Sequence, residues 1–419
     1  MAVDKNLFPY DVAVVSTMYN ESPYVKEWLD YHLLAGVDHF YIYDHESTDN
    51  LKEILQPYIE SGIVTYTLYP SPVSINAVYN DAVDKYKFFC RYMAVIDGDE
   101  FIFPQNNQSI PEVLDKFFAD KKQAAGLAIN WHCFGSNEQE TADYSKGVLE
   151  RFTRRAPKDF APPFPNGAPG GNAHIKTILN PRLVSYFDSP HFARYFENYF
   201  NVNEQGKIIP NCLSYPISVE NILINHYITK SKEEAFKRRG KSEEYFNTYN
   251  RNEVFDDSIL KYRESRLKMG GGSLERTINY QQLYSALLQN LSPTFVQNVS
   301  REFYQGKLET FLTCLKLAEY LREKVLDKDA VKIFEETALN AIFKSFAGNF
   351  SIADLKLLIT ELPEILQLNY PIVQNIRQNC VQILPQLINV YRLQSNWSEY
   401  MQLNHLLNLL KTFDNYNHK

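Results

Sequence analysis

The sequence has no apolar run that approaches the roughly 18 residues a membrane-spanning helix needs. Its N-terminus, residues 1–11, also lacks the apolar core of a secretory signal peptide. Cysteines number five, an odd count without CxxC spacing, which argues against a disulfide framework and a cysteine zinc site. With a net charge of −7, there is no basic excess of the kind that nucleic-acid binding requires. We therefore expect a cytoplasmic protein that does not bind nucleic acid.

What the sequence does contain is enough apolar material for about two globular domains. Hydrophobic residues make up 45% of the 419 positions, which is ordinary for a folded protein. The clearest linker signal is Gly270-Gly271-Gly272-Ser273. After it, apolar residues recur at helical spacing, most plainly over 308–321 and 355–362. We predict an N-terminal domain over residues 1–270 and an α-helical domain of unassigned role over 271–419.

The first hundred residues alternate between short apolar runs and amphipathic stretches, as in α/β proteins. The predicted elements are strands at 12–15, 39–43, 63–68 and 92–96 and helices at 25–36, 51–62 and 74–88. Ser22-Pro23 predicts the start of the first helix. This cadence predicts right-handed βαβ units and a doubly wound parallel sheet. Because ligands of such sheets bind outside the carboxyl ends of the strands, polar residues at those ends should face one crevice.

Three acidic residues follow the fourth apolar run, in the order Asp97-Gly98-Asp99-Glu100. Carboxylates at a strand end cost folding free energy unless their charge is compensated, and a divalent cation is a simple compensation. Asp97 and Asp99 both reach one ion if the chain bends at Gly98. Oxygen ligands select Mg²⁺ or Mn²⁺ over zinc, and such an ion neutralises charge on a departing diphosphate. A solvated charge cluster at a strand end is the alternative.

Polar residues also follow the first and second strands, as Tyr19-Asn20-Glu21 and Asp44–Asp49. Asp44 is a candidate acceptor for a base or a ribose. Ser47, Thr48 and Asp49 are equally suited to cap the helix that follows. Both interpretations of this segment stay open.

His226 closes the last apolar run, 222–228, just before Ser231 and Glu234, which are spaced as a capping box. A histidine at a strand end is either a hydrogen-bonded core residue or part of a site. His191 and His174 are further candidates of the same kind. The Pro-, Gly- and Asn-rich residues 157–173 predict a long loop, a feature that is more often functional than inert.

Several sequence blocks, taken in order, resemble glycosyltransferase family 92 and its family 2 relatives. The blocks are 14–21 (VVSTMYNE), 28–36, 43–49 (YDHESTD), 96–101 (IDGDEF), 131–136 (WHCFGS), 150–154, 176–182 (KTILNPR) and 224–231 (INHYITKS). Together they cover about residues 10–240. The resemblance implies a Rossmann-like GT-A fold. It also implies a metal-dependent, inverting transfer of a sugar, galactose-like or another hexose, from a nucleotide sugar that is commonly UDP-linked.

The resemblance also implies roles for individual residues. Asp97-Gly98-Asp99 would be the DxD motif that meets the donor and holds Mn²⁺ or Mg²⁺, with His226 as a further metal ligand and His191 as its alternative. Asp44 would contact the nucleobase or ribose. The residues expected to line the nucleotide pocket are Thr17, Tyr19, Asn20 and Glu21.

An inverting transfer needs a carboxylate that deprotonates the acceptor hydroxyl. Glu138, just after the WHCFGS block, is the candidate base, with Glu140 and Glu150 as alternatives. The acceptor would be a glycan or a lipid-linked sugar. A peripheral membrane contact and a homo-oligomer formed through the helical domain stay open. Two rival functions are a sugar-phosphate nucleotidyltransferase and a non-catalytic glycan-binding protein with the same fold.

Overall fold

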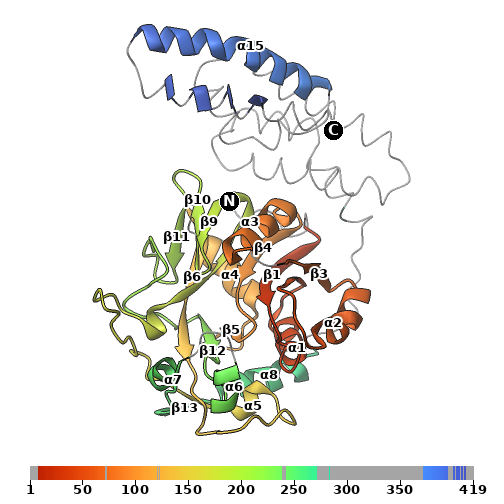
Figure 1. Cartoon of the computed structure of the whole chain (residues 1–419), viewed down its shortest axis with the longest axis vertical. Helices are drawn as coiled ribbons and strands as arrows, with labels where there is room; N and C mark the ends of the chain where they lie inside the picture. Colours follow the sequence, from red (N-terminus) through yellow and green to blue (C-terminus); the bar gives the residue numbers. More distant parts are fainter. Residues whose placement is uncertain are drawn as a thin grey trace. The chain divides into compact units, whose positions relative to one another are not determined.

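The computed structural model describes residues 8–270, apart from 71–72, 120, 122 and 238–241. In the C-terminal part it describes residue 283, residues 371–394 and part of 400–411. The chain forms two compact units, Met1–Ile278 and Asn279–Lys419 (Figure 1). The domain boundary at residue 270 stays a prediction, because residues 271–282 lie outside the described part.

In the Asn279–Lys419 unit, helix α15 (Pro371–Leu393) is described along its whole length. Leu384, near its middle, is fully buried. The helical prediction agrees with this stretch, and the predicted helical segments at 308–321 and 355–362 lie outside the described residues. Of the helices that the structure describes, none has both the length and the apolar character needed to cross a membrane.

The first half of the Met1–Ile278 unit is built as the sequence predicts. Its elements are β1 (Tyr10–Met18), α1 (Val25–Ala35), β2 (His39–Asp44), α2 (Leu51–Glu60), β3 (Val64–Leu68), α3 (Ile75–Tyr86) and β4 (Cys90–Val95). The four strands lie side by side in the order β3-β2-β1-β4, and all three pairings are parallel. The prediction of βαβ units is therefore confirmed over this half.

Helices cover both faces of these strands, and alternate residues of β1 show why. Val12 and Val14 pack into one core, which α1, α2 and a later helix, α4 (Ile110–Ala119), complete. Ala13 and Val15 point to the opposite face and pack into a second core with α3. A strand buried on both faces needs a continuous apolar run, which is what the sequence has there.

The second half of the sheet is mixed, so the prediction of a parallel sheet is wrong beyond β4. Its strands are β5 (Glu100–Pro104), β6 (Ala124–Cys133), β8 (Ile175–Leu179), β11 (Phe200–Asn203) and β12 (Ile222–His226). The order continues β4-β8-β6-β12-β5, with β8 antiparallel to β4 and to β6, and β12 antiparallel to β5. Antiparallel pairs need no crossover helix, and residues 125–230 lack the regular strand–helix alternation of the first half.

The remaining elements lie around the sheet (Figure 1). They are the helices α5 (Val148–Arg151), α6 (Lys232–Lys237), α7 (Glu243–Tyr249) and α8 (Ser258–Lys268), the strands β7 (Arg154–Arg155), β9 (Val184–Ser189), β10 (Phe192–Tyr195) and β13 (Val254–Phe255), and the 3₁₀ turns at Gly171–Ala173 and Pro181–Leu183.

Helix starts agree with the sequence in one case and differ in another. The backbone N–H of Ser231 donates to Glu234 Oε2 at 3.0 Å and that of Glu234 to Ser231 Oγ at 3.3 Å, so the predicted capping box is confirmed. Ser22, however, does not cap α1, which begins at Val25 after a turn. The backbone N–H of Ser22 donates instead to Asp49 Oδ2 at 2.9 Å, which ties the loop after β1 to the loop after β2.

Helix α1 supports β5, the last strand in the sheet order, through side chains that bond to its backbone. Trp28 Nε1 donates to the carbonyl oxygen of Glu100 at 2.8 Å, and Tyr31 OH donates to that of Ile102 at 2.9 Å. His32 Nε2 accepts from the backbone N–H of Ile102 at 3.1 Å. Burial lowers the pKa of His32 to about 3, which keeps the imidazole neutral and able to accept. The strand that begins at the acidic turn is therefore held rigidly from outside the sheet.

Candidate functional site

The acidic turn, Asp97–Glu100, joins β4 to β5 at the carboxyl end of β4. The Glu100 side chain folds back and its Oε2 accepts from the backbone N–H of Asp97 at 2.9 Å. Glu100 is fully buried and Asp99 is 4% exposed, whereas the Asp97 side chain is 37% exposed. Asp97 is therefore the acid of this turn that is most open to a ligand.

A buried lysine, Lys176 on β8, balances the charge of this turn. Its Nζ lies 3.0 Å from Asp97 Oδ2 and 3.5 Å from Glu100 Oε2. Burial opposes ionisation of Asp97, but the ammonium of Lys176 outweighs it, and the pKa of Asp97 is lowered. For Glu100, burial dominates and raises the pKa well above its usual range. The sequence analysis does not identify Lys176 as a site residue. A single lysine inside the apolar run 175–179 is nevertheless a signal that a buried carboxylate lies opposite.

His226, at the end of β12, meets the second aspartate of the turn. Its Nε2 lies 3.4 Å from Asp99 Oδ2 and its Nδ1 lies 3.9 Å from Glu100 Oε1. The backbone N–H of Tyr227 donates to the carbonyl oxygen of Asp99 at 2.9 Å. β12 and β5 pair antiparallel with His226 opposite Glu100, so the sheet register itself brings the histidine to the turn.

Two further histidines surround Trp131 on β6, beside His226. The His226 ring packs edge-on to Trp131 with centroids 4.3 Å apart, His174 stacks on Trp131 at 4.7 Å, and His191 lies at 5.4 Å. His191 Nδ1 lies 3.1 Å from the carbonyl oxygen of Ile175, and burial lowers the pKa of His191 to about 3. His191 and His174 are thus near the site, and His226 is the histidine that lies within 3.4 Å of an Asp99 oxygen.

The loops after β1 and β2 bond to one another. Asn20 Oδ1 accepts from the backbone N–H of Thr48 at 2.7 Å, and the Asn20 backbone N–H donates to Ser47 Oγ at 2.9 Å. Asp44 accepts from the backbone N–H of Ser47 at 2.8 Å and from Tyr66 OH at 2.7 Å. Ser47 and Thr48 therefore connect the two loops rather than cap α2.

Other residues predicted to line the nucleotide pocket lie close to the acidic turn. Tyr79 OH lies 3.5 Å from Asp97 Oδ1 and hydrogen-bonds to Thr17, while Tyr19 follows β1 directly. Gly98 lies against Glu21, since a Cβ built on Gly98 would lie 3.4 Å from Glu21 Cγ. The structure thus brings Thr17 and Glu21 to the turn from the end of β1.

A second buried lysine, Lys230, extends this wall. Its Nζ lies 3.9 Å from Glu21 Oε2 and 4.2 Å from the ring centroid of Tyr24, and its side chain is 2% exposed. Its φ of +54° lies in the left-handed region, at the turn between β12 and α6. Glu234 Oε1 accepts from Tyr24 OH at 2.8 Å, so α6 fixes the ring on which the ammonium rests.

The candidate base, Glu138, is exposed and lies in the loop that follows β6. Asn137 and Glu138 have φ values of +50° and +62°, a left-handed pair that turns the loop sharply. The alternatives are engaged elsewhere, because Glu140 lies 3.5 Å from Lys232 Nζ and Glu150 lies 3.1 Å from an Arg263 guanidinium nitrogen. The assignment of Glu138 as the base stays a prediction.

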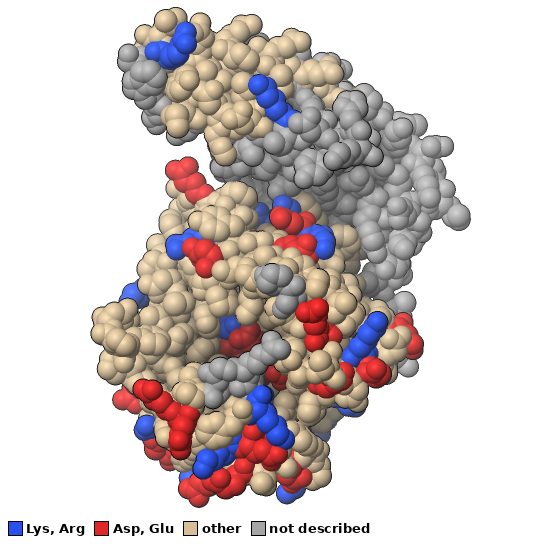
Figure 2. Space-filling model, in the orientation of Figure 1, with Lys and Arg blue, Asp and Glu red and all other residues tan. Residues whose placement is uncertain are grey.

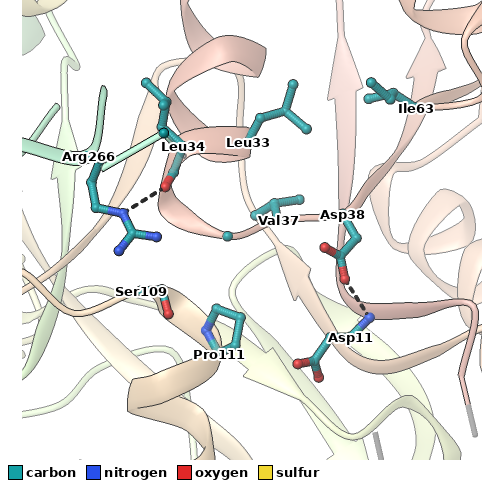
Figure 3. Close-up of a pocket in the computed structure, with 11 residues that line it drawn as sticks. Asp11, Leu33, Leu34, Val37, Asp38, Ile63, Ser109, Pro111 and Arg266 are labelled. Atoms are coloured by element: carbon teal, nitrogen blue, oxygen red, sulfur yellow. Dashed lines mark hydrogen bonds between the residues drawn. The ribbon is translucent and has the colours of Figure 1, made fainter. Parts of the chain in front are cut away.

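The hollow of the Met1–Ile278 unit has acidic and basic atoms on its floor (Figure 2). A separate pocket of about 420 Å³ lies at the opposite end of the strands, beside the start of β1 (Figure 3). There Asp38 Oδ2 accepts from the backbone N–H of Asp11 at 2.6 Å, and Arg266 Nε donates to the carbonyl oxygen of Leu34 at 3.1 Å. Since the acidic turn follows the carboxyl end of β4, this pocket is not part of the candidate site.

Comparison with known proteins gives matches to one family and to several of its members. The model of glycosyltransferase family 92 matches residues 11–269. A family 92 protein of Oryza sativa subsp. japonica is 27% identical over 211 residues, which are 50% of this chain and 34% of that protein. A galactan beta-1,4-galactosyltransferase of Arabidopsis thaliana is 32% identical over 111 residues, 24% of this chain and 21% of that protein. The chain therefore spans about a third or less of the length of these relatives.

Among solved structures, S. aureus TarS residues 1–349 in complex with UDP-GlcNAc is 12% identical with a TM-score of 0.29. The match covers 80% of this chain and 89% of that chain. A TM-score this low identifies no shared fold by itself.

Proposed function

Because the chain belongs to glycosyltransferase family 92, we propose that it moves a hexose from a nucleotide sugar, UDP-linked, to a glycan or lipid-linked acceptor with inversion at the anomeric carbon. One observation carries this proposal. The acidic turn stands at the carboxyl end of β4, touches His226 through Asp99, and adjoins the loop after β1, which in turn is hydrogen-bonded to the loop after β2. Ligands of α/β sheets bind at such a place, and here it is lined with acids, as a phosphate–metal site requires.

The donor nucleotide would lie across the loops after β1 and β2. Asp44 would accept from the ribose or base, beside Thr17, Tyr19, Asn20 and Glu21. These loops are already cross-linked by hydrogen bonds from Asn20 to Ser47 and Thr48, which orders the pocket before the donor arrives. An ordered pocket loses less conformational entropy when it binds.

The side chains of this site are suited to a divalent cation. Within the described part of the chain, no three His, Cys, Asp or Glu side chains converge closely enough to hold an ion. Asp99 and His226 do converge, with 3.4 Å between Oδ2 and Nε2. Mg²⁺ is commonly held by one or two carboxylates together with substrate phosphates, so two side chains near Asp97 suffice for this kind of site. Bound there, Mn²⁺ or Mg²⁺ would neutralise charge on the leaving diphosphate.

The chemistry then needs a base and a leaving-group partner. Glu138 would take the proton of the acceptor hydroxyl while the oxygen of that hydroxyl forms a bond to the anomeric carbon. The bond from that carbon to the diphosphate oxygen breaks on the opposite face, and the nucleoside diphosphate leaves. Lys230 would face the diphosphate, because it adjoins Glu21 and through it Gly98 of the turn. A buried ammonium strengthens its contact with a phosphate oxygen by excluding water.

Release of nucleoside diphosphate from a panel of nucleotide hexoses, with and without Mn²⁺, tests the function. We expect UDP release, and we expect Asp99→Asn to lower it at least about 100-fold, since metal stabilisation of the leaving group contributes several kcal/mol. Asp84→Asn, at an exposed position on α3, is the matched control and should leave the rate unchanged.

Three outcomes would contradict the proposal. Full UDP release by Asp99→Asn would remove the metal assignment. Release of pyrophosphate from a nucleoside triphosphate would identify a nucleotidyltransferase instead. Glycan binding without turnover of any donor would identify a non-catalytic binding protein.

A further inference from the structure

One buried ammonium group lies against the acidic turn, and family resemblance gives it no role. Besides its contacts with Asp97 and Glu100, Lys176 Nζ donates to the carbonyl oxygen of Pro190 at 3.2 Å. The side chain is 1% exposed. It reaches the turn because β8 is inserted between β4 and β6, antiparallel to both.

Burial of an ammonium group is unfavourable unless its charge is paired and its donors are matched. Lys176 satisfies both conditions, since it has two carboxylates and a carbonyl oxygen around it. Its nearest partner is not an interior acid, however. Asp97 is the most exposed acid of the turn, so the ammonium acts on the carboxylate that a bound donor would meet.

We propose that Lys176 is a fixed counter-cation that withholds Asp97 from the metal and presents it to the nucleotide, so that Asp99 and His226 are the protein's metal ligands. The proposal rests on the function proposed above. The ammonium occupies Asp97 Oδ2, at 3.0 Å, and leaves Oδ1 beside Tyr79 OH at 3.5 Å. Lys176 is thus a positioning residue, because it acts through Asp97.

This arrangement has a consequence for when the ion binds. A lysine charge beside the turn repels a divalent cation, so that the donor-free protein binds the ion more weakly than three neighbouring acids would suggest. The phosphates of the donor add negative charge, which offsets this repulsion. An ion would therefore bind more tightly together with the donor than alone.

Mn²⁺ titration of the donor-free full chain, followed by electron paramagnetic resonance, tests this proposal. Lys176→Met removes the charge while keeping the length of the side chain, and it should tighten Mn²⁺ binding about tenfold, the effect expected from removing one unit charge from a partly buried cluster. The double variant Lys176→Met/Asp97→Asn should bind Mn²⁺ more weakly than Lys176→Met, because it lacks the Asp97 carboxylate that the loss of the lysine had made available. Lys116→Met, at an exposed position on α4, is the matched control and should not change the affinity.

Thermal unfolding of the same variants covers the case in which Lys176→Met folds poorly. The added Asp97→Asn should then restore stability, since it removes the carboxylate that the lysine had balanced. Unchanged Mn²⁺ affinity in a folded Lys176→Met, no Mn²⁺ binding by any variant, or no rescue by Asp97→Asn would overturn the proposal. Neither readout needs a sugar donor, so a chain that transferred no sugar would still decide the question of Lys176.

Discussion

A buried ion pair, Arg151–Glu234, holds together the wall that carries Lys230. Arg151 Nη1 and Nη2 lie 2.9 Å and 2.5 Å from the two carboxylate oxygens of Glu234, and both side chains are 2% exposed. Glu234 also accepts from Tyr24 OH at 2.8 Å and from the backbone N–H of Ser231 at 3.0 Å. Helices α5 and α6 and the turn before α1 therefore meet at one carboxylate.

Replacing Glu234 with glutamine should destabilise the unit strongly. The change leaves Arg151 buried without its anionic partner, and breaking one side of a buried pair costs about 3–5 kcal/mol. The pKa of Glu234 gives an independent estimate. Although burial alone would raise it, the bonds from Arg151, Ser231 and Tyr24 lower it from 4.5 to about 2. A decrease of this size contributes about 3 kcal/mol to the free energy of unfolding at neutral pH.

Urea unfolding of the wild type and Glu234→Gln at pH 7 measures this cost, which we expect to be about 3 kcal/mol. Glu233→Gln is the matched control, because Glu233 neighbours Glu234 on α6 and its side chain is 38% exposed, paired with Lys237. The control should change stability far less. Arg151→Met added to Glu234→Gln should recover part of the loss, because it removes the unpaired cation.

The pH dependence has a definite sign. Folding lowers the pKa of Glu234, so its contribution is present above about pH 4.5 and is lost as the pH falls toward 2. The difference between wild type and Glu234→Gln should therefore shrink on acidification. Equal stability of Glu234→Gln and Glu233→Gln, or a difference that persists unchanged at pH 3, would refute the reasoning.

Two other predictions follow from buried groups near the site. His32→Phe removes the acceptor of the Ile102 N–H and should cost about 2 kcal/mol in urea unfolding. Burial lowers the pKa of His32 to about 3, so protonation of the unfolded chain should take about 1.4 kcal/mol per pH unit from the wild type below pH 6.5, a loss that His32→Phe should escape. Lys230→Met should weaken UDP binding about tenfold by calorimetry, the value of a charge-assisted hydrogen bond, whereas the exposed Lys116→Met should bind UDP normally.

The first half of the fold was predictable because periodicity is a local property. The apolar runs at 12–15 and 92–96 are buried on both faces and became β1 and β4 of a parallel sheet. Beyond β4 the prediction of a parallel sheet failed at β8. Whether a strand enters a sheet parallel or antiparallel depends on the path of the connecting loop, and residues 157–173 carry no periodic pattern that records this path.

The sequence predicts the part of the site whose residues are neighbours in the chain. It predicts less of the part that strand pairing brings together. Asp97 and Asp99 are adjacent to a predicted strand end, and their charge alone pointed to a ligand. The contact of His226 with Asp99 depends on the pairing of β12 with β5, which only the structure shows. The resemblance to family 92 proteins predicts His226 as a metal ligand without knowledge of this register. The matching role of Asp44 and its neighbours stays a prediction.

Two buried lysines pair with acids of the site, Lys176 on β8 with Asp97 and Lys230, in the turn after β12, with Glu21. In the sequence Lys176 stands out as the single lysine of the apolar run 175–179, whereas Lys230 lies in a basic segment that resembles a solvated helix face. A buried ammonium group is tolerated in a folded chain only where carboxylates pair with it. Buried carboxylates without a cation likewise lower the stability of the fold. Lys176 therefore balances part of the negative charge of the acidic turn. A divalent cation that binds together with a nucleoside diphosphate would balance the rest.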